Sequence, residues 1–180
     1  NWIENLRRKF HFNRRYLGSP PWDTGVSPPE LIAFLENARP GVALDVGCGT
    51  GTNLLSLARA GWQVMGVDVA CLAVLQARRR LKKASVPGKV FLRDAGAPLE
   101  LPCQFNFVLD MGCFHNLSQP ERRHYRDNLK RWLLPGGVYL LYAHRPRTDL
   151  RHHGVDDADL AAFSSFLTLT WQQENAETRP

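Results

Sequence analysis

The sequence has no long apolar run. Its 180 residues contain no stretch that approaches the roughly 20 apolar residues a helix needs to cross a bilayer. The opening residues, up to about Pro20, are basic and aromatic, without the continuous apolar segment or small-residue cleavage site of a secretory signal. We therefore expect a cytoplasmic protein with no membrane-spanning helix and no membrane partner.

Cysteine is sparse and its spacing is not that of a disulfide framework or a zinc site. The four cysteines are Cys48, Cys71, Cys103 and Cys113. They form no C-x-x-C pair and lie in or beside apolar segments, where buried reduced thiols are common. The pair His152 and His153 lacks helical spacing and a neighbouring ligand set, so we interpret it as surface loop. No metal site is predicted.

Basic residues outnumber acidic ones. There are 23 Lys and Arg against 17 Asp and Glu, which gives a formal net charge of +6. Much of the excess lies in two groups, Arg7, Arg8, Lys9, Arg14 and Arg15, and Arg78, Arg79, Arg80, Lys82 and Lys83. Because solvated helix faces and helix C-terminal ends also collect such residues, we treat nucleic acid as the lesser alternative to a small-molecule partner, and expect a monomer.

Apolar runs of strand length alternate with helical patterns from residue 42 onward. Strands are predicted at 42–46, 63–69, 89–94, 105–111 and 138–143 and near 166–171, and helices at 53–60, 72–84 and 120–133 and near 156–165. Ser118 is the predicted cap of the helix at 120–133. Repeated β-α-β units predict a doubly wound, mainly parallel, Rossmann-like α/β sheet with helices on both faces and ligands at the carboxyl ends of its strands.

Residues 1–28 form an N-terminal helical and aromatic extension, and residues 29–180 the main domain. A helix is predicted over 2–16, then a turn rich in Pro and Gly, then a helix over 30–37 that stops before Pro40. The aromatic residues of the first helix are Trp2, Phe10, Phe12 and Tyr16. They either line a substrate lid or dock an amphipathic helix on the core, and we favour docking.

A glycine-rich turn follows the strand at 42–46. Gly47, Gly49 and Gly51 expose backbone and helix-terminal N–H groups to a ligand. Nicotinamide and flavin sites space their glycines G-x-G-x-x-G, whereas position 52 is Thr. Asp45 fits a ligand that carries an ammonium group, since it would repel a pyrophosphate. The turn therefore predicts an amino-acid-bearing nucleotide.

Two further acids end the next two strands. Asp68 follows Gly51 by 17 residues, where an acid accepts hydrogen bonds from ribose hydroxyls. Asp94 can accept the exocyclic amino group of adenine while apolar neighbours enclose the ring, and Val69 and Ala95 complete this set. The three successive acids match three parts of one ligand.

These motifs resemble the class I S-adenosylmethionine-dependent methyltransferases from about Val42 to Ala143. The resemblance lies in D-x-G-x-G-x-G, the two later acids, FNFVLD and LLPGGVYLL. It implies S-adenosylmethionine as cofactor, S-adenosylhomocysteine as product, and cofactor contacts from the glycine turn, including Cys48. The turn PWDTG and the segment 109–137 are similar to the small-molecule group of tellurite-resistance, thiopurine and thiol or halide methyltransferases. That likeness implies that Trp22 and Asp23 close the methionine end and that Gly25 permits the turn.

The fourth predicted strand carries the candidate transfer site. Asp110 and Met111 are predicted cofactor contacts, and Asp110 and His115 are the candidate catalytic residues. The alternative for Asp110 is a cap of local backbone, and the alternative for His115 is a structural role. Cys113 is interpreted as a small buried hydrophobe rather than a nucleophile. A thiolate needs no proton removed during transfer, whereas a neutral amine or hydroxyl would profit from His115.

The sequence thus predicts methyl transfer to a small, soft nucleophile, such as a thiol, halide or chalcogen oxyanion, by in-line displacement. The alternatives are RNA or protein methylation and cofactor binding without turnover. The stretch DMGC stands where many methylators of amino groups carry Asn-Pro-Pro-Tyr. Class I sheets usually end in a seventh, antiparallel strand, and only QQENAETRP follows Trp171, so we expect the natural chain to continue beyond Pro180.

Overall fold

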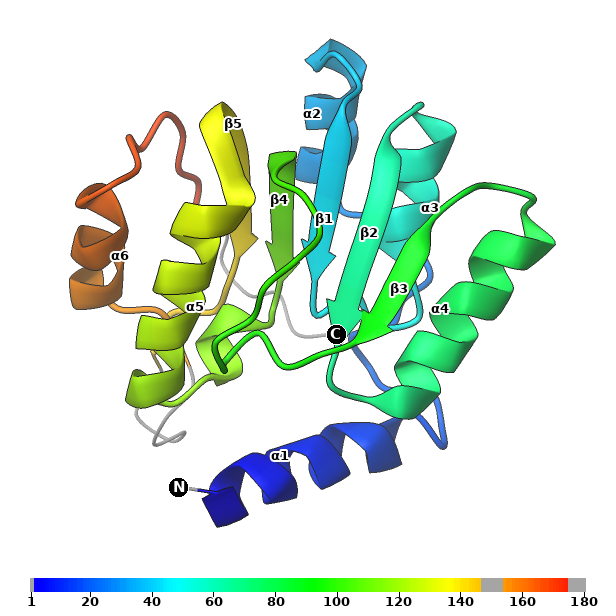
Figure 1. The fold of residues 1–180 in the computed structure, drawn as a ribbon, viewed down its shortest axis with the longest axis horizontal. Coiled ribbons are helices and arrows are strands. Elements are labelled where there is room, and N and C mark those ends of the chain that lie inside the picture. Colours follow the sequence, from blue (N-terminus) through cyan, green and yellow to red (C-terminus); the bar gives the residue numbers. More distant parts are fainter. Residues whose placement is uncertain (1, 147–153, 175–180) are drawn as a thin grey trace.

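A parallel sheet of five strands, in the order β3-β2-β1-β4-β5, forms the centre of the molecule (Figure 1). The computed structural model describes residues 2–146 and 154–174. The strands are β1 (Val42–Val46), β2 (Gln63–Asp68), β3 (Lys89–Leu92), β4 (Phe105–Met111) and β5 (Leu133–Tyr142). Every neighbouring pair is parallel, which confirms the predicted fold class.

Helices cover both faces of the sheet. They are α1 (Trp2–Arg15), α2 (Pro29–Asn37), α3 (Thr52–Arg59), α4 (Cys71–Lys83), α5 (Gln119–Trp132) and α6 (Asp157–Ser164), with a short 3-10 turn η1 (Phe114–Asn116). Leu31, Leu54 and Ala77 bring α2, α3 and α4 into one buried cluster with Phe107 of β4. Side chains of α5 and α6 pack with Val108, the next residue of that strand, in a second cluster. Because successive residues of a strand face opposite sides, the two clusters lie on opposite faces.

The chain reverses direction across the sheet between β1 and β4. From β1 it moves outward to β2 and β3, and then returns to β4 on the other side of β1. In open α/β sheets the crevice at the carboxyl ends of two such strands is the usual ligand site. Helix α1 crosses beneath these carboxyl ends (Figure 1). The fold therefore places the glycine turn after β1 and the loop after β4 beside each other.

Two strand predictions differ from the structure. Strand β5 begins at Leu133 and not at Val138, and its pairing with β4 shifts between Phe105 and Phe107, where Gly136 takes a φ of +76°. The strand predicted near 166–171 is wrong: these residues form no strand, and Leu169 and Trp171 are exposed. The described sheet ends at β5, and residues 166–171 pair with none of its strands.

The expectation of buried cysteines is correct for Cys48 and wrong for Cys71 and Cys103, which are exposed. Each of the latter lies just outside a strand, at the start of α4 or in the loop before β4. Within 2–146 and 154–174, no group of three or more His, Cys, Asp or Glu is arranged to hold a metal ion. Among those residues no helix has the length and apolarity for a transmembrane span. His152 and His153 lie outside the described residues.

Candidate active site

The glycine turn is fastened to the end of β2. The N–H groups of Gly47 and Cys48 both donate to the carbonyl of Val67, at 2.8 and 3.1 Å. Gly47 has a φ of +71°, and a Cβ added there would lie 2.8 Å from the Cβ of Cys113. A Cβ on Gly49 would lie 3.0 Å from the Tyr16 hydroxyl. Any side chain at these two positions would thus strain the backbone and close the space at the turn.

Asp45 is a buried carboxylate without a hydrogen-bond partner. Neither of its oxygens touches solvent or any donor in the described structure. Burial, and then the charges of Asp110 and Asp68, raise the pKa of Asp45 well above its usual value. An unpaired buried carboxylate is costly, and a cationic ligand at the adjoining glycine turn would offset that cost. This arrangement fits the ammonium group of the predicted cofactor.

Asp68 braces the glycine turn. One of its oxygens accepts the N–H of Gly49 at 2.9 Å and the other accepts the N–H of Ala70 at 2.8 Å. Burial raises the pKa of Asp68, although these backbone bonds oppose the shift. Each carboxylate oxygen has a second lone pair. Asp68 can therefore orient the turn and at the same time accept a hydrogen bond from a ribose hydroxyl. The bond to the ribose stays a prediction.

Asp94 is engaged by helix α1. Its carboxylate accepts from Asn5 at 2.8 Å and pairs with Arg8 at 2.9 Å and Lys9 at 3.1 Å. Burial opposes ionisation, but the Arg8 charge and these hydrogen bonds outweigh it and lower the pKa of Asp94 to about 2. The N–H of Gly96 also donates to it, at 3.0 Å. The predicted bond to adenine would therefore have to share this carboxylate with α1.

The W-D-x-G turn lies against the glycine turn. The hydroxyl of Thr50, inside the glycine turn, donates to Asp23 at 2.8 Å. The Trp22 indole N–H donates to the hydroxyl of Tyr16 at 3.2 Å, and the two rings meet edge to face. Gly25 has a φ of +73°, which favours glycine. The structure thus places this turn against the glycine turn, and its closure of the methionine end stays a prediction.

The carboxylate of Asp110 is wholly buried and fully bonded. It accepts the N–H groups of Cys113 at 2.7 Å and Phe114 at 3.0 Å, and the hydroxyl of Tyr125 at 2.6 Å. Burial raises the pKa of Asp110 to about 6, although these bonds oppose the rise. These hydrogen bonds agree with the alternative in which Asp110 caps local backbone. In that role the carboxylate holds the loop after β4 in place.

His115 lies in η1, directly after that loop, and is buried. Its Nδ1 accepts the backbone N–H of His144 at 3.3 Å, so a neutral ring carries its proton on Nε2. The neighbouring thiol of Cys113 has a pKa raised well above its usual value by burial and then by the charge of Asp110. Cys113 is thus held as a thiol and not as a thiolate nucleophile, although it is partly exposed and not buried as expected.

The remaining predicted contacts lie around the same edge. Cys48 and Ala95 are buried, and Val69 and Met111 are partly exposed. Sequence reasoning missed the partners that α1 supplies, Asn5 and Arg8, although their spacing with Phe12 marks one helical face. It also missed Arg122 on α5, whose guanidinium is buried. No local sequence pattern indicates that this arginine is buried.

Arg122 ties the loop after β4 to the C-terminal part of the chain. Its guanidinium forms a buried ion pair with Asp159 of α6. It also donates to the carbonyl of Leu117 at 3.0 Å, of His115 at 3.2 Å and of Gly154 at 2.7 Å. The position of His115 thus depends on a contact between segments far apart in the sequence.

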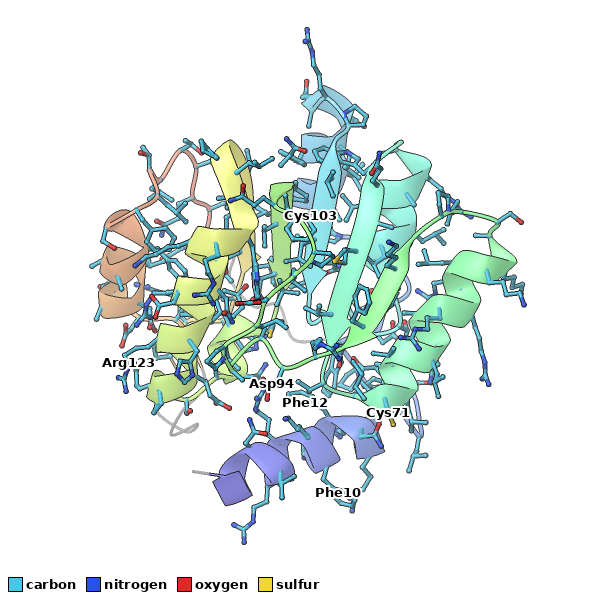
Figure 2. All side chains as sticks on the ribbon, in the orientation of Figure 1. Phe10, Phe12, Cys71, Asp94, Cys103 and Arg123 are labelled. Atoms are coloured by element: carbon cyan, nitrogen blue, oxygen red, sulfur yellow. The ribbon has the colours of Figure 1, made fainter. Side chains whose placement is uncertain are left out.

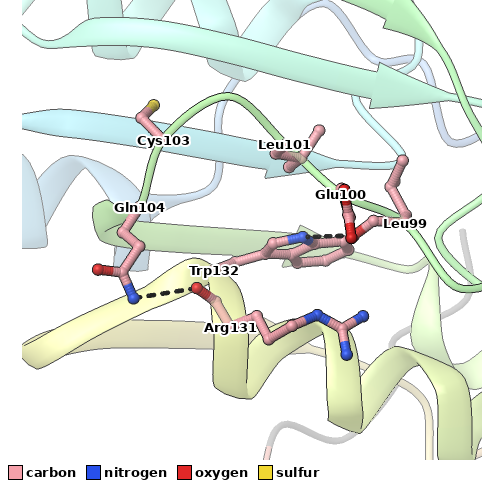
Figure 3. Close-up of a pocket in the computed structure, with 7 residues that line it drawn as sticks. All are labelled: Leu99, Glu100, Leu101, Cys103, Gln104, Arg131 and Trp132. Carbon is pink, nitrogen blue, oxygen red and sulfur yellow. Dashed lines mark hydrogen bonds between the residues drawn. The ribbon is translucent and has the colours of Figure 1, made fainter.

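A surface pocket of about 470 Å³ lies at the other end of the sheet (Figure 3). Its lining residues are Leu99, Glu100, Leu101, Cys103, Gln104, Arg131 and Trp132. Gln104 precedes β4 and Trp132 precedes β5, so the pocket adjoins the amino ends of these strands. The Trp132 indole already donates to the carbonyl of Leu99 at 3.1 Å. This pocket therefore takes no part in the site.

Together, the doubly wound parallel sheet, the glycine turn and the acids that end β1, β2 and follow β3 define a class I S-adenosylmethionine-dependent methyltransferase domain. Residues 43–137 match the family described as "Methyltransferase domain", and the chain belongs to this family.

The relatives of this chain have diverse names. The chain is 27% identical to a 2-heptyl-1-hydroxyquinolin-4(1H)-one methyltransferase of Mycobacteroides abscessus, over 77% of this chain and 64% of the relative. It is 34% identical to ribosomal RNA small subunit methyltransferase C of Alcanivorax borkumensis, over 59% of this chain and 33% of the relative. It is 26% identical to probable thiol methyltransferase 2 of Arabidopsis thaliana, over 67% of this chain and 54% of the relative. The chain thus spans between a third and two thirds of the length of these relatives.

Solved structures share the fold. TehB from Haemophilus influenzae superposes with a TM-score of 0.74 at 19% identity, covering 93% of this chain and 58% of that chain. A structure described as "Conversion of a Disulfide Bond into a Thioacetal Group during Echinomycin Biosynthesis" superposes with a TM-score of 0.65 at 29% identity, covering 74% and 56%.

Proposed function

We propose that this protein transfers the methyl group of S-adenosylmethionine to a small, soft nucleophile such as a thiol, a halide or a chalcogen oxyanion. The observation that carries this choice is the arrangement of the two candidate bases. Asp110 accepts two backbone N–H groups and the Tyr125 hydroxyl, and Nδ1 of His115 accepts from His144. Neither is set to remove a proton, and a soft anion needs none removed.

The residues around the glycine turn fit the cofactor. When bound, S-adenosylmethionine supplies a methyl group activated by its sulfonium. In our proposal Asp45 pairs with the ammonium group, Asp68 accepts from the ribose and Asp94 orients the adenine. Trp22, held by Tyr16, covers the methionine end, so that the site excludes water and aligns the acceptor.

The small size of the acceptor is supported by the connections between strands. Residues 93–104 alone link β3 to β4, so in the described part of the chain no inserted domain adjoins the site to hold a macromolecule. The names of two relatives, a thiol methyltransferase and a hydroxyquinolinone methyltransferase, agree with small acceptors.

The test is transfer of label from S-adenosylmethionine to a panel of acceptors. We expect label in a thiol, iodide or tellurite, little in a phenol, and none in RNA. Asp45→Asn should lower the rate at limiting cofactor by at least about tenfold, because it removes a charge-assisted hydrogen bond. Asp127→Asn changes an exposed carboxylate on α5 and should leave the rate unchanged. Label in RNA alone would replace the proposal by the RNA methyltransferase alternative, in line with the ribosomal RNA relative.

A further inference from the structure

Helix α1 has one face turned toward the domain and another turned away from it. Five described residues contact the domain, namely Asn5, Arg8, Lys9, Phe12 and Asn13. They recur at the spacing of a single helical face. Figure 2 shows Phe12 directed toward the domain and Phe10 directed away from it. The sequence-based expectation that Phe10 lines a lid or docks on the core is therefore wrong.

The outward face carries an apolar stripe. Leu6 is 47% exposed and Phe10 is 70% exposed, and Leu17, in the turn that continues the helix, is 77% exposed. At about 100° per residue these three positions fall within a narrow sector of the helix surface. A contiguous exposed stripe of large apolar side chains marks an interaction surface, whereas single exposed residues do not.

A basic stripe lies beside the apolar one. Arg7, His11 and Arg14 occupy the next sector of the same outward face, and all three are exposed. The segment from Asn5 to Trp22 holds five Lys or Arg residues and no Asp or Glu. From Asn5 onward the helix therefore joins an apolar strip to an electropositive one, and Glu4 is the acid of its first turn.

The orientation of this face is fixed. Near its start α1 is held through Arg8, which bridges Asp94 and Glu121 at 2.9 Å each. Near its end the Asn13 side chain accepts the N–H of Leu72 on α4 at 3.1 Å. The apolar stripe cannot turn inward without breaking these contacts, so it stays presented to the surroundings.

We propose that the outward face of α1 docks on an anionic lipid surface, with Leu6, Phe10 and Leu17 inserted among the acyl chains and the arginines at the headgroups. A helix with adjoining apolar and basic stripes lies in the plane of such an interface. Arginines alone would be sufficient to bind the phosphates of a nucleic acid. The apolar stripe beside them has no role in such binding, so it favours a lipid surface. This proposal replaces the sequence-based expectation of no membrane partner and needs no membrane-spanning helix. Helix α1 then lies between the lipid surface and the carboxyl ends of the strands.

The experiment is co-sedimentation of the full chain with vesicles of phosphatidylglycerol and phosphatidylcholine, and with phosphatidylcholine alone. We expect binding to the anionic vesicles that falls by about tenfold or more in high salt, because each arginine near the surface contributes about fivefold. Phe10→Ser with Arg14→Gln should weaken binding by at least about tenfold. Leu75→Ser with Arg79→Gln is the matched control, since it changes an exposed leucine and arginine at the same spacing on α4.

Any of four results would overturn the proposal. Three of them are absence of binding to anionic vesicles, an equal loss in the α4 control, and RNA binding by a protein that does not bind vesicles. Self-association abolished by Phe10→Ser, without vesicle binding, would assign the stripe to a second copy of the chain. A second variant, Arg7→Gln with Arg14→Gln, keeps the apolar stripe and removes two charges. It should reduce binding to the anionic vesicles and leave any binding to phosphatidylcholine vesicles unchanged, which tests the contribution of charge independently of the Phe10 variant. None of these readouts depends on methyl transfer.

Discussion

Asp45→Asn should raise the melting temperature of the cofactor-free protein while it weakens S-adenosylmethionine binding by about 10- to 150-fold. The affinity falls because a charge-assisted hydrogen bond to the ammonium group, worth about 1.5 to 3 kcal/mol, becomes a weaker one. The stability rises because the variant removes a buried carboxylate without a partner. Calorimetry with and without cofactor measures both effects on one sample.

The pH dependence of this stability effect has a defined sign. Because the folded pKa of Asp45 is raised above the value of 3.8 for an unperturbed carboxyl, the unfolded chain ionises first as the pH rises. The wild-type protein therefore loses stability above about pH 4 relative to a variant that cannot ionise there. The gain in melting temperature of Asp45→Asn should be larger at pH 8 than at pH 5. Unchanged affinity, or a variant equally stable at both pH values, would contradict the role assigned to Asp45.

Arg122→Met should lower the free energy of unfolding by about 3 to 5 kcal/mol. The substitution leaves the buried carboxylate of Asp159 with the longer contact to Arg126, at 3.5 Å, as its remaining ion pair, and removes the donor from three carbonyls. Urea unfolding followed by circular dichroism gives the change directly. Arg123→Met, one residue along α5 and exposed, is the matched control and should change stability by less than about 0.5 kcal/mol.

A double variant separates the two origins of this loss. Arg122→Met with Asp159→Leu removes both buried charges, and we expect it to recover about half of the lost stability. The recovery is incomplete because Asp159 also takes part in the capping of α6, where its oxygen accepts the N–H of Asp156. A double variant no more stable than Arg122→Met would place the loss in the carbonyl contacts and not in the unpaired carboxylate.

The central sheet and the glycine turn follow from local sequence. Apolar runs bounded by turn residues predicted β1 to β4, and the spacing of Asp45, Gly47 and Gly49 predicted the turn that the structure contains. These features depend on a few neighbouring residues and on the period of a strand or helix. The W-D-x-G turn was placed by resemblance alone, and the bond from Thr50 to Asp23 supports that placement.

Features that depend on distant contacts were not predictable in the same way. The engagement of Asp94 by Asn5 and Arg8 joins residues more than 80 positions apart, and the Arg122 ion pair joins α5 to α6. Periodicity also misled near Leu169, because an alternating pattern forms a strand only when it pairs with another strand, and residues 166–171 pair with none. Aromatic content did not reveal which face of α1 docks, and that face is identified by the contacts of Asn5 and Arg8 in the structure.

The central claim is that the turn after β1 holds S-adenosylmethionine, and titration calorimetry tests it most directly. Separate titrations with S-adenosylmethionine, S-adenosylhomocysteine and NADH should give saturable heat for the two sulfur compounds, one site per chain, and none for NADH. The amino-acid moiety common to both sulfur compounds is what Asp45 is placed to recognise. Absence of binding to either sulfur compound, or saturable binding of NADH, would contradict the account.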